Sequence, residues 1–181
     1  MIQKGCLIDT TALPNVLPQA DQVGYLLAPD GMPKMQEGRG DFLPDATQLA
    51  LRFLQNDPDG FFLMVEGSQI DWGGHANDSD YIIEEVKDFD KVIHAAMDFA
   101  EKDGNTLVIV TADHETGGYS LSAPTVFGRS DYGQILPSFS TKNHSASLVP
   151  VFAYGPGEHL FKGVYQNNDI FHKMMRAWKK K

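Results

Sequence analysis

Short continuous apolar runs mark three segments of the chain as strands. Phe61–Val65 and Thr106–Thr111 are apolar without alternation, which is typical of parallel strands covered on both faces. Val149–Tyr154 is a third such run and stops at Gly155-Pro156-Gly157. The first two runs lead directly into polar residues, Glu66 after one and Asp113-His114 after the other.

Three other segments repeat apolar residues at helical spacing. The first starts near Asp45 and ends at Asp57-Pro58-Asp59-Gly60. The second can be capped by Asn77, Asp78 or Ser79 and is closed by Gly104. Its apolar stripe consists of Ile82, Val86, Phe89, Ile93, Met97 and Ala100. The third spans roughly Asp169–Lys179. These patterns predict three helices.

The order of these elements predicts an α/β fold with a mainly parallel sheet flanked by helices. Residues 1–41 are rich in turns around one short strand, Val23–Ala28, and residues 116–141 are again rich in turns. No linker or repeat divides the chain, so we expect residues 1–181 to form one domain. In such sheets the ligand site lies beyond the carboxyl ends of the strands. Glu66, Asp71, Asp113 and His114 all fall there.

Composition and charge narrow the choice of partners. The chain has 181 residues with 42% hydrophobic and 22% charged residues, which are ordinary globular values. A formal net charge of −9 argues against nucleic acid or an anionic membrane as a partner, and the basic run Lys179–Lys181 is explained by a solvated helix end.

Cys6 is the single cysteine, so neither an internal disulfide nor a thiolate zinc site can form. No apolar run reaches the length of a membrane span, and Met1–Cys6 lacks the apolar core of a signal peptide.

Candidate metal ligands lie in three places. Asp71 and His75 are four residues apart, a spacing that lets a helical turn or a tight loop aim both at one ion, and His144 stands in a later loop. Asp113 and His114 are adjacent at a strand end. Each has an ordinary alternative on its own: a surface loop, a turn cap or a solvated loop histidine. We assign no ligand role to His94, on or beside the polar face of the long helix, or to His159 and His172, which flank the terminal turn and helix. Together, oxygen and imidazole ligands suit hydrolytic zinc sites, and two ions about 4 Å apart can clamp an in-line displacement.

Three motifs resemble the metal-ligand motifs of alkaline phosphatases. They are Met64–Asp78, Thr111–Gly118 and the run from His144 through Val149-Pro150-Val151 to Gly155-Pro156-Gly157. They occur in the family's order, and the match extends from about Tyr25 to the last helix. The resemblance implies an alkaline-phosphatase-like fold and a metal-dependent phosphomonoester hydrolase that acts on a small phosphate monoester with two Zn²⁺ and one Mg²⁺.

The resemblance also implies a role for each matching residue. Asp71, His75 and His144 would hold the first zinc, Asp113 and His114 the second zinc, and Glu66 the magnesium. Trp72, Gly117 and Gly118 would line the substrate pocket. The resemblance further implies a parent protein that is periplasmic or extracellular, since the family is usually exported.

Several of the family's catalytic residues have no counterpart in this chain. The serine nucleophile, a bridging aspartate, another magnesium ligand and a phosphate-binding arginine lie upstream of these motifs in the family. Ile8–Thr11, Arg39 and Arg52 are not convincing substitutes. We therefore assign no catalytic nucleophile and interpret the chain as a partial domain, the C-terminal portion of the fold. We expect it to bind one zinc, to have little activity alone, and to self-associate through uncovered sheet edges.

Two other functions remain open. Another hydrolase of the same superfamily, such as a phosphodiesterase, sulfatase or phosphoglycerate mutase, shares the Asp-x-x-x-His, Asp-His and late His pattern. A non-catalytic metal-binding fragment that scavenges metal or supports a partner is the third possibility. The context Val65–Asp71 and Gly155-Pro156-Gly157 favours the phosphatase.

Overall fold

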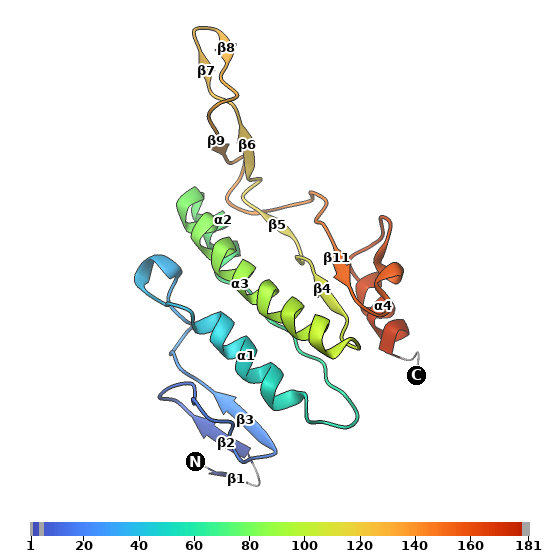
Figure 1. Cartoon of the computed structure of the whole chain (residues 1–181). Coiled ribbons are helices and arrows are strands. Elements are labelled where there is room, and N and C mark those ends of the chain that lie inside the picture. Colours follow the sequence, from blue (N-terminus) through green and yellow to red (C-terminus); the bar gives the residue numbers. More distant parts are fainter. Residues whose placement is uncertain (1, 4–5, 179–181) are drawn as a thin grey trace.

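The computed structural model describes residues 2–3 and 6–178, and helices are its longest elements (Figure 1). The helices are η1 (Met35–Glu37), α1 (Phe42–Leu54), α2 (Gln69–Ala76), α3 (Ser79–Asp103), η2 (Glu158–Phe161) and α4 (Asp169–Trp178). The strands are β1 (Ile2–Gln3), β2 (Cys6–Asp9), β3 (Gln22–Tyr25), β4 (Val108–Val110), β5 (Glu115–Thr116), β6 (Ser120–Ser122), β7 (Thr125–Val126), β8 (Arg129–Ser130), β9 (Leu136–Ser138), β10 (His144–Ser145) and β11 (Phe152–Tyr154). The predicted end of the last helix, Lys179, lies outside the described residues.

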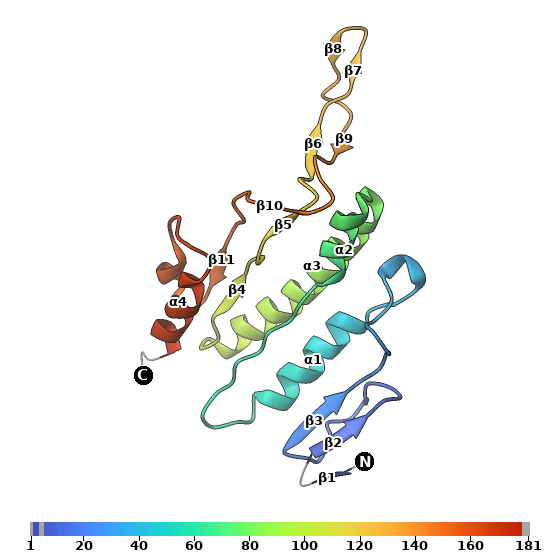
Figure 2. The same ribbon diagram turned by 180° about the vertical axis from the view of Figure 1, so that it is seen from behind.

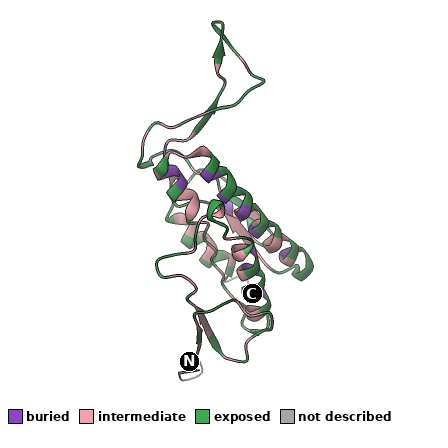
Figure 3. Cartoon of the chain, turned by 90° about the vertical axis from the view of Figure 1, so that its left-hand side faces the viewer, coloured by how far each residue is buried: buried purple, intermediate pink, exposed green. Residues whose placement is uncertain are grey.

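The packed core lies between α1 and α3, which run side by side (Figures 1 and 3). Almost all of the buried apolar side chains belong to these two helices: Leu49 and Leu51 of α1, and Tyr81, Ile82, Val92 and Ala100 of α3. Phe161 of η2 is the other one among the described residues. The predicted helices are confirmed, with α1 starting three residues before Asp45. Pro44 fits there because a proline costs no hydrogen bond in the first turn of a helix.

Local signals set both ends of α3. The Asp78 carboxylate accepts a hydrogen bond from the Tyr81 amide at 3.0 Å, the N-cap interaction that satisfies a free helix donor. At the other end, Gly104 has φ +70° and donates its amide to the Ala100 carbonyl. The sequence predicted both ends because capping depends on residues adjacent in the chain.

A buried ionic cluster ties the loop before α1 to α3. The Arg39 guanidinium contacts Glu85 and lies 2.9 Å from Asp88, and all three side chains are nearly inaccessible to solvent. Glu85 also accepts the Met35 amide at 2.7 Å. Burial is the largest single influence on the Arg39 pKa and would lower it. The hydrogen bonds and charges of Glu85 and Asp88 together outweigh burial and raise the pKa above its ordinary value. Glu85 and Asp88 therefore stay buried because a cation is held between them.

The strands pair mostly in antiparallel fashion, contrary to the predicted mainly parallel sheet. Of the six strand pairings in residues 2–3 and 6–178, only β2–β3 is parallel. β4 pairs with β11 in the antiparallel sense, with Val110 opposite Phe152. The mainly parallel sheet is absent here because a parallel ladder needs a neighbouring strand, and the other edge of β4 has none in the described part of the chain.

The strand predicted at Phe61–Val65 is wrong as a buried, paired strand. The segment is extended but joins no ladder. Its residues alternate between partly buried and exposed, and Phe62 and Met64 are 63% and 74% exposed. The sequence pattern required cover on both faces, whereas the structure covers one face with α3 and leaves the other open.

The turn-rich region after residue 118 forms a two-stranded arm that projects from the body (Figures 1 and 2). β6 pairs with β9, and β7 pairs with β8 at the tip, where Phe127 is fully exposed. In the described part of the chain, no helix combines the length and the apolarity that crossing a membrane requires.

Candidate metal centre

Three short elements meet to form the candidate site: α2, β5 and β10. β10 pairs with β5, which sets His144 opposite Thr116. The helix approaches β5 closely at Gly74, where a Cβ atom would lie 2.8 Å from the Thr116 carbonyl oxygen. Gly73 meets α3 in the same way, 2.9 Å from Ile82 Cγ1. Two glycines therefore let α2 bring its polar side chains within reach of β5 and β10.

Asp71, His75 and His144 converge on one point. His75 Nε2 lies 3.4 Å from Asp71 Oδ2 and 3.3 Å from His144 Nε2, and His144 Nε2 lies 3.6 Å from Asp71 Oδ1. His75 Nδ1 donates to the Lys142 carbonyl at 2.7 Å, because a carbonyl can only accept. Its Nε2 lone pair therefore faces the other two groups, the arrangement of a metal-ligating imidazole.

The pairwise distances are of the size found between the ligands of one zinc ion. With zinc bonds of about 2.0–2.1 Å, two ligand atoms of a tetrahedron are about 3.3–3.4 Å apart. The separations of 3.3, 3.4 and 3.6 Å are close to this value, with His75 nearest to Asp71 Oδ2 and His144 nearest to Asp71 Oδ1. Three protein ligands leave the fourth position open, as in catalytic zinc sites. The donor set therefore fits the ion that the sequence predicts.

His114 brings the second predicted ligand pair next to the first set. Its ring stacks on that of His144 with centroids 3.6 Å apart, and its Nε2 lies 3.2 Å from Asp113 Oδ2. Ligand atoms of Asp71, His114 and His144 lie within 4.8 Å of one another, so the geometry also groups His114, predicted for the second zinc, with two ligands of the first, in a set that does not include His75. The two predicted ligand sets are thus contiguous. Asp113 is 85% exposed and faces solvent, so this second set is open on one side.

Thr116 connects the two sets, and sequence reasoning missed it. Its hydroxyl donates to Asp71 Oδ1 at 2.5 Å, and its oxygen lies 3.2 Å from His114 Nδ1. Since the single hydroxyl proton is used on Asp71, the oxygen accepts from His114 Nδ1–H. This leaves His114 Nε2 directed at Asp113. The contact joins residues 45 positions apart, so no spacing rule could have revealed it.

Glu115 holds the backbone behind the ligands. It accepts the amides of Gly118 and Tyr119 at 3.1 and 2.9 Å and the hydroxyl of Ser145. Partial burial is the largest influence on the Glu115 pKa and would raise it, but the combined hydrogen bonds, led by that of Ser145, hold the pKa below its ordinary value. The ionised carboxylate thus joins β5 to β10, which carries His144.

The other predicted site residues take up different positions. Glu66 is exposed at the end of the extended run Phe61–Val65 and belongs to no group of three metal-ligating side chains in the described residues. Trp72 is 62% exposed on α2. Gly117 is buried with φ +92°, and its amide donates to the Asn143 carbonyl, while a Cβ on Gly118 would collide with Ser140. The two glycines therefore shape the turn that returns the chain to His144.

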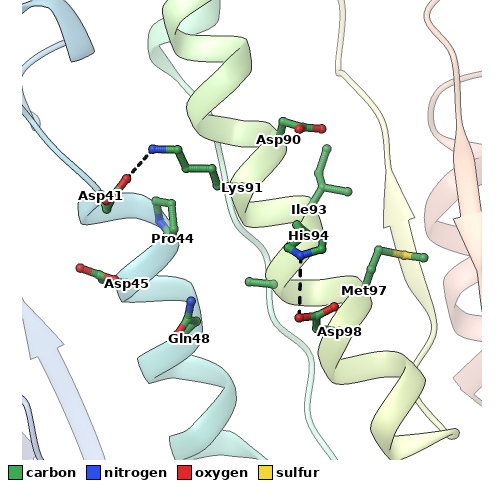
Figure 4. A pocket seen from close by; sticks show the side chains of 11 residues that line it. Asp41, Pro44, Asp45, Gln48, Asp90, Lys91, Ile93, His94, Met97 and Asp98 are labelled. Carbon is green, nitrogen blue, oxygen red and sulfur yellow. Dashed lines mark hydrogen bonds and ion pairs between the residues drawn. The ribbon is translucent and has the colours of Figure 1, made fainter.

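A separate hollow lies between α1 and α3 (Figure 4). It is an open groove of about 620 Å³. Lys91 bonds to Asp41 across it, and His94 Nε2 lies 3.9 Å from Asp98. The groove contains none of the predicted ligands. Its ionic pairs are explained by side chains on neighbouring helical turns and by one contact between the two helices.

Comparison with known proteins agrees with the three motifs. The family model for alkaline phosphatase matches residues 15–135 and 133–180. Alkaline phosphatase 3 of Bacillus subtilis is 51% identical over 59% of this chain and 23% of its own length. Alkaline phosphatase 4 of the same species is 31% identical over 87% of this chain and 49% of its own. The chain thus spans about half or less of the length of these curated relatives.

Solved structures agree as well. The alkaline phosphatase of the Antarctic bacterium TAB5 is 53% identical and superimposes with a TM-score of 0.92 over 97% of this chain and 52% of that one. A His 135 Glu mutant of the TAB5 enzyme, described with Mg bound in its M3 site, gives a TM-score of 0.91 at 54% identity. The fold is therefore alkaline-phosphatase-like.

The chain belongs to the alkaline phosphatase family, a family of hydrolases. The resemblance seen in the motifs is confirmed. The assignment of individual ligands stays a prediction.

Proposed function

We propose that this chain is the zinc-ligand portion of an alkaline phosphatase and that the complete protein hydrolyses small phosphate monoesters. The convergence of Asp71, His75 and His144 at separations of 3.3–3.6 Å carries the proposal. Zinc bound there would supply a Lewis acid for the oxygen of the leaving group. Magnesium at Glu66 and a second zinc at Asp113 and His114 are parts of the same proposal.

Each residue of the cluster has a defined task in this proposal. His75 is oriented by the Lys142 carbonyl, so its Nε2 needs no rearrangement to bind metal. Thr116 fixes the Asp71 carboxylate and the tautomer of His114 together. Trp72 and the Gly117-Gly118 turn would border the phosphate ester. We place residues 1–181 in one partial domain of the fold and the complete protein in the periplasm or outside the cell.

Zinc content tests the first site. After dialysis against zinc, we expect one moderately bound zinc per chain by mass spectrometry, and its loss in His75→Ala and His144→Ala. His94→Ala is the matched control, because His94 also lies beside an acid four residues away but outside the cluster. Equal zinc in all of these variants would contradict the proposal.

The role of Thr116 is tested by two substitutions of different chemistry. Thr116→Val removes the hydroxyl at nearly constant volume, and we expect zinc affinity to fall about 10–100-fold, as is typical of lost outer-shell partners. Thr116→Ser keeps the hydroxyl and is expected to retain most of the affinity. A competition titration with a chromophoric chelator measures both. Identical affinities would remove Thr116 from the metal centre.

Hydrolysis of p-nitrophenyl phosphate tests the activity. We expect the chain alone to have little activity with zinc and magnesium, because it offers no identified nucleophile beside the cluster. Turnover at the level usual for the family would show that the chain carries a nucleophile that we have not recognised. A preference for diesters or sulfate esters by the complete protein would favour the other superfamily members.

A further inference from the structure

The first turn of α2 carries a bonded side chain that faces away from the metal ligands. Gln69 is the first residue of α2, and Asp71 follows two positions later. Successive residues of an α-helix are rotated by about 100°, so these two side chains leave opposite sides of the helix. Asp71 meets Thr116 of β5, whereas Gln69 meets the loop that precedes α1. The helix therefore lies between this loop and the metal cluster.

Both ends of the Gln69 amide are engaged. Its nitrogen donates to the Met32 carbonyl at 3.0 Å, and its oxygen accepts the hydroxyl proton of Tyr81. The orientation is fixed because a carbonyl can only accept a hydrogen bond, so the NH₂ group must face Met32. Burial, followed by the charge of Glu85, raises the pKa of Tyr81 above its ordinary value, so the hydroxyl stays protonated and able to donate. Gln69 thus ties α2 to the loop and to α3 at once.

The loop that receives Gln69 is itself fixed to α3, and we refer to residues 32–39 as the anchor loop. The Met35 amide donates to Glu85 of α3 at 2.7 Å, and the Arg39 guanidinium contacts the same carboxylate. Arg39 also donates to the Pro33 carbonyl at 3.2 Å, which closes the loop on itself. Figures 1 and 2 both show this loop beside the end of α3 that adjoins α2. The anchor loop is therefore a fixed support for α2.

The two ends of α2 are held by different means. At its C-terminal end a tight turn leads into α3, in which the Asp78 amide donates to the Gly73 carbonyl at 3.1 Å. At its N-terminal end Ser68 makes no side-chain cap bond. A helix of 8 residues is too short to be stable alone, so its position depends on contacts with the rest of the chain. Loss of the Gln69 contact would let the first turn, which carries Asp71, move away from β5.

We propose that Gln69 is a positioning residue of the metal centre, which holds α2 against the anchor loop so that Asp71 and His75 meet β5 and β10. Gln69 touches neither the ion nor the substrate and acts only through the helix. What the cluster binds rests on the proposed function, whereas the placement of α2 does not depend on a metal.

Two substitutions of Gln69 test this role in the full chain. Gln69→Met keeps the length of the side chain and removes both hydrogen bonds, and Gln69→Glu sets a carboxylate oxygen against the Met32 carbonyl. We expect zinc affinity to fall by about tenfold or more in both, as is typical of lost outer-shell partners, in a competition titration with a chromophoric chelator. Gln55→Met is the matched control, because Gln55 also donates to a backbone carbonyl, that of Arg52, but at the end of α1.

The absorption spectrum of the chain loaded with Co²⁺ separates positioning from stability. The d–d bands of Co²⁺ depend on the geometry of its ligands, so we expect altered bands in Gln69→Met and unchanged bands in Gln55→Met. Urea unfolding of the same samples shows whether each variant is folded. Lower stability with wild-type zinc affinity and a wild-type cobalt spectrum would mean that Gln69 only stabilises the fold, and would overturn the proposal.

Tyr81→Phe provides a milder test that does not alter Gln69. It removes one of the two hydrogen bonds of the Gln69 amide and leaves the Met32 contact in place. We expect a smaller fall in zinc affinity than in Gln69→Met. If the Gln69 variants do not fold, this variant decides the proposal, and wild-type zinc affinity in folded Tyr81→Phe would contradict it.

A contact within the metal-free chain distinguishes this proposal from the proposed function. A Cβ added to Gly74 would lie 2.9 Å from Thr116 Cγ2. We therefore expect a strong nuclear Overhauser effect between the Gly74 α-protons and the Thr116 methyl group, and its loss in Gln69→Met. If the wild-type chain binds no zinc but shows this dependence on Gln69, the proposed function is wrong and the positioning stands. If it binds zinc and neither the affinity nor this contact changes in Gln69→Met, the positioning is wrong and the proposed function stands.

Discussion

The two sides of α3 differ in how far this chain completes them. Toward α1, the helix buries apolar side chains and the Arg39–Glu85–Asp88 cluster. Toward residues 61–66 and β4, which we call its strand side, it supports extended segments whose outer faces and edges are uncovered in the described part of the chain. Stability is therefore concentrated on the helix side, while the strand side and the elements that continue from it carry the candidate ligands. The fold separates the part that holds the chain together from the part that does chemistry.

Removing Arg39 should cause the largest loss of stability on the helix side. Arg39→Met leaves two buried carboxylates without their cation, and we expect the free energy of unfolding in urea to fall by about 3–5 kcal/mol. Lys91→Met is the control, because Lys91 pairs with Asp41 at the surface between the same two elements. Little change is expected there. Similar losses in both variants would mean that the buried cluster does not dominate the helix side.

Replacing one apolar side chain on each side of α3 compares how much the two sides contribute to stability. Leu49→Ala on α1 is expected to cost about 2–5 kcal/mol, because it opens a cavity in the packed core. Phe62→Ser on the strand side is expected to change stability by no more than about 0.5 kcal/mol, because the ring is already mostly in solvent. A large loss in Phe62→Ser would show that the chain covers this side by itself in solution.

Widening the contact between α2 and β5 should affect stability and metal together. Gly74→Ala puts a methyl group 2.8 Å from the Thr116 carbonyl oxygen, so the helix must move away, at about 1–3 kcal/mol. The movement separates Asp71 from Thr116, and zinc affinity is expected to fall as well. Gly31→Ala has open space around it and is the control. Unchanged zinc affinity in Gly74→Ala would mean that the cluster adjusts independently of α2.

The smallest expected effect concerns the start of α3. Asp78→Ala removes the bond to the Tyr81 amide and should cost about 0.5–2 kcal/mol in thermal or urea unfolding. Asp80→Ala removes an exposed first-turn acid that caps nothing, so its effect should be smaller. Zinc affinity should stay unchanged in both. Equal losses would indicate that helix charge, rather than the cap, stabilises this end.

Features that depend on neighbours in the chain could be predicted from the sequence. Helical spacing, the Asp78 cap and Gly104 predicted α3. The spacing of Asp71 and His75 predicted only that a helical turn or a tight loop could aim both at one ion, and the structure places them on the helix α2. The motifs predicted the family, because each keeps its ligand residues within a short run. The sequence alone also indicated that the later part of an alkaline phosphatase fold is present without an identified nucleophile.

Features that depend on distant segments were decided only by the tertiary structure. Thr116 joins Asp71, the Lys142 carbonyl orients His75, and Arg39 meets Glu85 and Asp88, all across separations of 45 to 67 residues. The apolar run Phe61–Val65 predicted a buried strand, because apolar side chains are suited to contact with other apolar groups. Whether a neighbour is present to make that contact is a property of the assembled fold. In this chain that neighbour is absent from the described residues, and the strand stays open.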